Sequence, residues 1–108
     1  MNYSFIADKI YSLLKENNVD FKEFYLVEDK DMNYCYPTNH FDFYLIIIGN
    51  KSENDLTREE TKKISDITFD IDLEFDTLTR HLVFTEEEFN SDILAKNSSM
   101  RSNYHYVA

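Results

Sequence analysis

The chain has 108 residues, 43% of them hydrophobic, and 21 acidic against 11 basic side chains give a formal net charge of −10. This length and apolar content suit one packed core, so we expect a single domain over residues 1–108. The acidity argues against the Lys and Arg clusters that neutralise a phosphate backbone, so we expect no direct binding of nucleic acid. It favours a protein partner with a basic surface.

Nothing in the sequence points to export or to a membrane. The single cysteine, Cys35, cannot form an internal disulfide. Residues 1–18 lack the basic start and apolar run of a signal peptide, and the apolar run at 46–48 is far too short to cross a bilayer. We therefore expect a cytoplasmic protein.

The first half of the chain predicts one helix and two strands. Apolar residues recur at helical spacing over residues 4–17, with Ser4 as a candidate N-cap. Aromatic and β-branched residues at 21–27 predict a strand, and a polar loop with the only proline follows. A second strand over 41–48 is apolar enough to be buried on both faces.

The second half predicts two helices and a strand. Thr57 and Glu60 form a capping box before a helix over 58–75, and a strand follows at 77–84. Thr85 and Glu88 repeat the capping signature before a short third helix. The tail from residue 97 has no clear period and is interpreted as either loose or docked. The order αββαβα predicts an α/β (α+β) fold in which helices cover a small mixed sheet.

One carboxylate stands at the entrance of the second strand, in the segment YPTNHFDFYLIIIG over residues 36–49. Asp42 has two interpretations at this point. It either caps or pairs at the strand entrance, or it belongs to a functional site.

The segment PTNHFDFYLIIIG resembles the second-strand motif of the minimal nucleotidyltransferases of the pol β superfamily, in which Ser-Asp-x-Asp leads into an aromatic and aliphatic strand. The run over residues 57–90 and the tail from residue 97 resemble the helix, strand and closing segment that follow in that family. The resemblance implies two aspartates that hold Mg²⁺ against the phosphates of ATP, a third carboxylate on the next strand, and an earlier Gly-Ser turn beside the phosphates.

This chain departs from that pattern at the sites that carry the chemistry. The aspartate pair falls on His40 and Asp42, the Gly-Ser pair falls on Glu28 and Asp29, and the third carboxylate is Asp76. Two acids in place of Gly-Ser would repel phosphates and block their approach. We therefore expect a degenerate domain without catalysis or cofactor. The alternative is an active enzyme that transfers a nucleotide to a toxin or RNA, with Mg²⁺ on Asp42 and ATP as donor.

The resemblance also implies a kind of partner, because minimal nucleotidyltransferases resemble antitoxins that are paired with RNase toxins. A degenerate copy would act by binding, as an antitoxin-like or anti-defence (anti-CRISPR-like) inhibitor of an RNase toxin or a nucleic-acid-guided nuclease. The candidate partner-binding residues are Glu28, Asp29, Tyr34, Tyr36, Asp66 and Asp70. Acids on the second helix are also typical of a solvated face, and the tyrosines equally fit a core.

Overall fold

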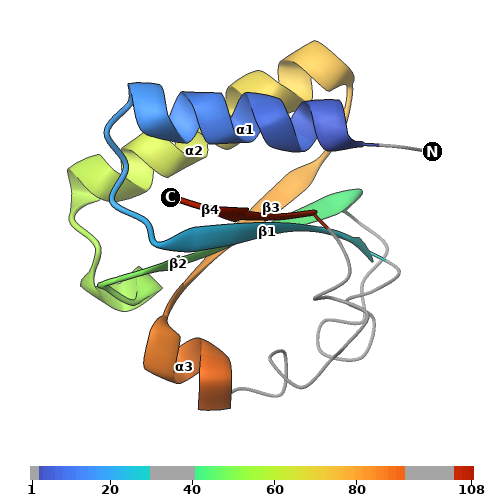
Figure 1. Cartoon of the computed structure of the whole chain (residues 1–108). Coiled ribbons are helices and arrows are strands. Elements are labelled where there is room, and N and C mark those ends of the chain that lie inside the picture. The colour runs from blue at the N-terminus through green and yellow to red at the C-terminus, as the bar shows by residue number, and fades with distance from the viewer. Residues whose placement is uncertain (1–2, 30–40, 92–103) are drawn as a thin grey trace.

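The computed structural model describes residues 3–29, 41–91 and 104–108, and within them four strands form one mixed sheet (Figure 1). The strands are β1 (Glu23–Glu28), β2 (Phe43–Gly49), β3 (Thr79–Thr85) and β4 (Tyr104–Val107). They lie in the order β3-β2-β1-β4. β2 and β3 are parallel, and the two other pairs are antiparallel. The mixed α+β architecture confirms the predicted fold class.

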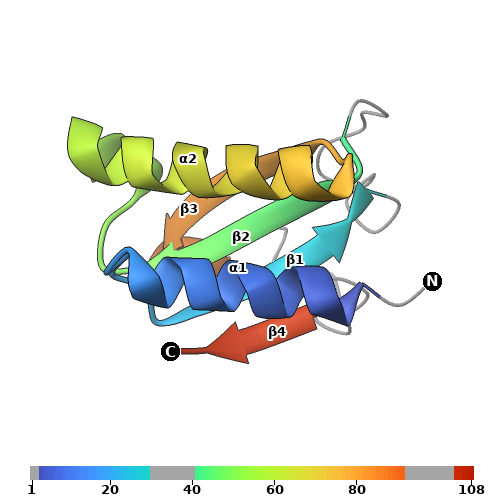
Figure 2. The ribbon, with the colours of Figure 1, turned by 90° about the horizontal axis from the view of Figure 1, so that it is seen from above.

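Helices cover both faces of this sheet. On one face, α1 (Ser4–Glu16) and α2 (Arg58–Phe75) lie side by side and run in opposite directions, as Figure 2 shows from above. On the other face lies the short α3 (Glu86–Ser91) (Figure 1). The 3-10 turn η2 (Glu53–Asp55) and α2 form the crossover that parallel pairing of β2 with β3 requires.

The core has two layers, which meet at β2. All seven residues of β2 are buried, which confirms the prediction of a strand covered on both faces. Leu45 and Ile47 pack with buried residues of α1 and α2. Tyr44 and Ile46 point to the opposite face and pack with Phe89 of α3. β2 therefore belongs to both layers of the core.

The helix starts follow the capping signals in two of three cases. In α2, Thr57 Oγ1 accepts the N–H of Glu60 at 3.1 Å, and the Glu60 carboxylate accepts the N–H of Thr57 at 3.0 Å. Thr85 and Glu88 make the same reciprocal pair ahead of α3. The prediction of Ser4 as N-cap was wrong: Ser4 is the first helical residue, and Tyr3 occupies the cap position without a side-chain cap.

The tail from residue 97 has two interpretations, loose or docked, and its described end, residues 104–108, is docked. β4 adds a strand that the predicted order αββαβα lacks, and it pairs with β1. The ring of Tyr106 stacks on Phe24 with centroids 5.0 Å apart, and Tyr104 Oη accepts the N–H of Tyr3 at 2.8 Å. Among the described helices, none has the length and apolar character needed to span a membrane.

Candidate binding site at one end of the sheet

A hollow of about 470 Å³ opens where α1 and β2 begin and where β1 and α2 end. The described residues that line it combine four carboxylates with four aromatic rings, and none of them is Lys or Arg. We call this site the acidic hollow; it is lined by Tyr3, Glu28, Asp29, Phe41, Asp42, Phe43, Phe75, Asp76 and Thr77.

Two of the carboxylates come from the end of β1. Glu28 is the last residue of this strand, and Asp29 follows it, with its N–H donated to Asp42 O at 3.2 Å. Within the described part of the chain, Asp29 Oδ1 is buried and accepts no hydrogen bond. A buried carboxylate oxygen without a donor is energetically unfavourable, so Asp29 contributes an unsatisfied acceptor at this end of the sheet.

The third carboxylate, Asp42, fixes the start of the parallel pair. Asp42 Oδ2 accepts the N–H of Leu78 at 2.9 Å, and the N–H of Asp42 is donated to Leu78 O at 2.8 Å. These two bonds align the entrance of β2 with the entrance of β3. Pairing at the strand entrance, one of the two interpretations of Asp42, is therefore what the geometry shows, and it holds this carboxylate at the rim of the hollow.

The fourth carboxylate, Asp76, lies in an unfavourable place for an acid. It is the C-cap of α2 and has left-handed backbone angles, φ 54° and ψ 50°. This conformation favours glycine, and the negative end of a helix dipole disfavours an acid. Asp72, one turn earlier, has a structural role, because its carboxylate accepts Thr77 Oγ1 at 2.9 Å and the N–H of Thr79 at 3.1 Å. No comparable contact accounts for the side chain of Asp76 among the described residues.

The aromatic rings give the hollow an apolar wall beside its charges. Tyr3 and Phe43 meet edge to face with centroids 4.8 Å apart, and Phe75 meets Phe5 in the same way at 5.4 Å. Ring faces attract cations through their quadrupole, and carboxylates attract them by charge. The described lining of the hollow is therefore chemically more favourable to a cation than to an anion.

The structure brings together four of the residues singled out from the sequence, Glu28, Asp29, Asp42 and Asp76, at this one site. Three others, Tyr34, Tyr36 and His40, lie outside the described residues. Sequence reasoning did not single out Tyr3 or Phe75 for this site. The sequence around each of them does not indicate a binding site, because both residues reach the hollow only through the packing of α1 against α2.

Asp66 and Asp70 do not line the hollow but lie exposed on α2. The Asp66 carboxylate accepts Lys62 Nζ at 2.8 Å, one helical turn away, and this contact raises the pKa of Lys62. Such an exposed pair contributes little to stability. Both acids therefore lie on the exposed side of α2, outside the lining of the hollow.

Two acids of the described lining, Glu28 and Asp29, disfavour a bound polyphosphate. The described residues include no group of three or more His, Cys, Asp or Glu side chains placed to hold a metal ion. Glu28 and Asp29, which stand where the resembled family has Gly-Ser, present their carboxylates at the hollow and would repel phosphate oxygens there. The chemistry of the hollow suits a cation better than a polyphosphate.

Comparison of the chain with protein-family models, curated protein sequences and solved structures finds no match. The likeness to nucleotidyltransferases therefore rests on the sequence motifs alone. A fold class hosts many unrelated functions, so the function has to be argued from the chemistry of the site.

Proposed function

We propose that this chain is a catalytically degenerate nucleotidyltransferase-like protein that acts in the cytoplasm by binding and inhibiting a protein partner with a basic surface. In this proposal a Lys or Arg side chain of the partner enters the acidic hollow. The observation that carries it is the composition of the described lining: four carboxylates and four aromatic rings, without a basic residue. Charge-assisted hydrogen bonds and cation–π contact both favour a guanidinium or ammonium group there.

The acid-rich end of α2 supports the same proposal. From Ile64 to Thr79 the chain has five acidic residues and no Lys or Arg. The last turn of α2 has no basic side chain, although the negative end of the helix dipole would favour one. Departures from local stability of this kind are expected at functional surfaces.

Two large apolar side chains lie on the same solvent-facing stripe of α2. Phe69 and Leu73 stand one turn apart, with 61% and 68% of their surface exposed. Large exposed apolar side chains with acids around them suit an interface that has an apolar centre and a charged rim. Asp66 and Asp70 would then face basic residues of the partner at that rim.

The partner class that fits this surface is an enzyme with a positively charged channel for nucleic acid, such as an RNase toxin or a nucleic-acid-guided nuclease. Acids that occupy such a channel would compete with phosphates and inhibit the enzyme, in the manner of an antitoxin-like or anti-CRISPR-like inhibitor. Opposite charge would also speed the encounter, and this acceleration would fall as salt is added.

The experiment that tests the hollow is a titration with a short fluorescent peptide that carries two arginines between glycines. A hollow-neutral variant replaces three lining acids, as Glu28→Gln, Asp29→Asn and Asp76→Asn. A control variant has the same net charge but changes exposed acids elsewhere, as Glu16→Gln, Glu53→Gln and Glu87→Gln. We expect the hollow-neutral variant to bind at least about fivefold more weakly than the control. Equal binding by the two variants would mean that only overall charge matters.

Nucleotide transfer is separated from pure binding by calorimetric titration with ATP and Mg²⁺. The proposal expects no saturable heat from the wild-type protein or from the Asp42→Asn variant, with both shown to be folded. Saturable heat that disappears in Asp42→Asn would overturn it in favour of an active enzyme, and the search would move to the acceptor.

A further inference from the structure

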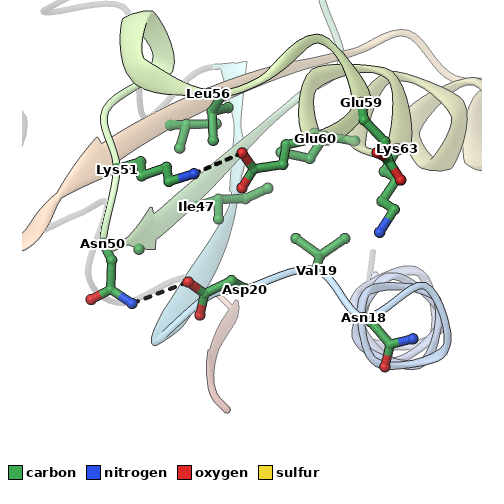
Figure 3. Close-up of a pocket in the computed structure, with 13 residues that line it drawn as sticks. Asn18, Val19, Asp20, Ile47, Asn50, Lys51, Leu56, Glu59, Glu60 and Lys63 are labelled. Carbon is green, nitrogen blue, oxygen red and sulfur yellow. Dashed lines mark hydrogen bonds and ion pairs between the residues drawn. The ribbon is translucent and has the colours of Figure 1, made fainter.

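A second pocket, of about 270 Å³, lies at the opposite end of the sheet from the acidic hollow. It opens between the segment after α1, the carboxyl end of β2 and the first turns of α2 (Figure 3). The carboxyl ends of parallel strands are where α/β units commonly bind ligands. The pocket is smaller than the roughly 300–1,000 Å³ of sites for drug-sized ligands, so its size suits a small metabolite.

The floor of this pocket is aliphatic. None of the thirteen described lining residues is aromatic, although 16% of the chain is. Ile47, Ile64 and Val83 are core residues that the pocket reaches from outside. We call the site the aliphatic pocket; its apolar lining residues are Val19, Ile47, Leu56, Ile64 and Val83.

Two contacts hold the rim of the pocket in place. Asn50 Nδ2 donates to Asp20 Oδ2 at 3.1 Å, and Lys51 Nζ donates to Glu60 Oε1 at 3.0 Å (Figure 3). Gly49 allows the segment at Asp20 to lie this close, because an added Cβ would stand 3.2 Å from Asp20 O. The rim is therefore preformed, which lowers the entropy cost of binding.

The described rim of the pocket carries charges of both signs, and only Lys51 and Glu60 form an ion pair with one another. Glu60 is used by Thr57 and Lys51, which lower the pKa of its carboxyl to about 2 and so keep it ionised. Glu59 and Lys63 stand one helical turn apart on the pocket side of α2, and neither forms an ion pair with another described residue (Figure 3). Among the described residues of the rim, Glu59 and Lys63 thus carry opposite charges that no ion pair uses, and the Asp20 carboxylate has the neutral amide of Asn50 as its partner.

From this geometry we infer that the aliphatic pocket binds a small zwitterion with an aliphatic body, of the class of the free aliphatic α-amino acids. The side chain of the ligand lies on the aliphatic floor, its ammonium group pairs with Glu59, and its carboxylate pairs with Lys63. A phosphate is disfavoured, because the acidic residues Glu59 and Glu60 occupy the first turn of α2 and the capping box already uses the N–H of Glu60. This inference does not depend on the acidic hollow.

The test is a titration of the full chain with L-leucine, followed by the shifts of backbone amide resonances. We expect saturation with a dissociation constant of about 1 mM or below, and shifts confined to the residues around the pocket. Three other compounds serve as comparisons. Isovalerate lacks the ammonium group, leucine amide lacks the carboxylate, and phenylalanine has a ring that we expect to be too large for the aliphatic pocket. Each should bind at least about fivefold more weakly than leucine. Absence of saturable leucine binding, or equally strong binding of isovalerate or inorganic phosphate, would overturn the inference.

Matched variants test whether leucine binding depends on the proposed ion pair in the pocket or only on the overall charge of the protein. Lys63→Gln should weaken leucine binding at least about fivefold, whereas the control Lys62→Gln, whose residue pairs with Asp66 on the solvent side, should leave it unchanged. Val19→Phe should fill the pocket and abolish binding, with folding checked by the amide spectrum. Equal effects of Lys63→Gln and Lys62→Gln would contradict the proposed ion pair. The hollow-neutral variant should still bind leucine, so the two proposals can fail independently.

Discussion

The two ends of the sheet treat charge in opposite ways. At the aliphatic pocket, the described lining mixes acids with bases, and one acid and one base, Glu60 and Lys51, form an ion pair. At the acidic hollow, four carboxylates share the described lining without any cation. The acidic side chains behind the net charge of −10 are therefore unevenly distributed between these two sites. The described lining of one site therefore carries charges of both signs, whereas the described lining of the other carries negative charge only.

The largest effect should come from two isoleucines of α2. Ile71 lies fully in the core, whereas Ile64 also lines the aliphatic pocket. We expect Ile71→Ala to lower the free energy of unfolding by about 3–4 kcal/mol and Ile64→Ala by about 2 kcal/mol, because truncation beside an open pocket adds less new void. Urea denaturation measures both. Equal losses would mean that the pocket is closed in solution.

A smaller effect should separate the structural role of Asp42 from its charge. Asp42→Ala removes the acceptor for the N–H of Leu78 and should cost about 1–2 kcal/mol of stability. Asp42→Asn keeps an oxygen in place and should cost less than half of that. Thermal unfolding of the two variants compares them. A cost for Asn that matches the cost for Ala would show that the charge, and not the hydrogen bond, stabilises the strand entrance.

A gain in stability should accompany a loss of binding at Asp76. Asp76→Gly relieves the left-handed backbone and the repulsion by the helix dipole, so it should raise the free energy of unfolding by about 1 kcal/mol. It should also weaken binding of the arginine peptide by about threefold.

The other end of the molecule supplies the control, because Asn18 has the same φ of 54°. Asn18→Gly should give a smaller gain, since asparagine tolerates this conformation, and it should leave peptide binding unchanged. A similar loss of peptide binding in both variants would remove Asp76 from the site.

The smallest effect should be the pH dependence that Glu60 contributes at the aliphatic pocket. Its pKa is lowered from 4.5 to about 2 by hydrogen bonds from Thr57 and by Lys51. A folded pKa below the unfolded one stabilises the protein above pH 4.5, and this contribution is lost as pH falls toward 2. The melting temperatures of wild type and Glu60→Gln should therefore differ at neutral pH and converge in acid. A constant difference would show that the carboxylate charge is not involved.

The parts of the fold that could be predicted are those with local signals. The bounds of α2 followed from its capping box and its repeated isoleucines, and β2 followed from its unbroken apolar run. The cap at Ser4 failed because a distant contact, between Tyr3 and Tyr104, helps set the start of α1. β4 has only four residues, and it is a strand because it pairs with β1. Its sequence is too short to show the alternating pattern from which a strand can be predicted.

The two sites also differ in how far the sequence indicated them. The family resemblance singled out four acids, and the structure places them around one hollow, although their role stays a prediction. The aliphatic pocket had no sequence signal, because its lining comes from segments between residues 18 and 83 that meet only in three dimensions. Gly49, the single glycine, marks the close approach at its rim but does not by itself indicate a pocket.

The pairing of β4 with β1 has a consequence for the order of folding. Its contacts join residues far apart in the chain, as the separation of 101 residues between Tyr3 and Tyr104 illustrates. Closing so long a loop is entropically costly until the rest of the sheet exists, so β4 should join late. Contacts that form after the transition state of folding slow unfolding but leave the folding rate almost unchanged. Truncation of Tyr106, which stacks on Phe24, should therefore accelerate unfolding and hardly change the refolding rate.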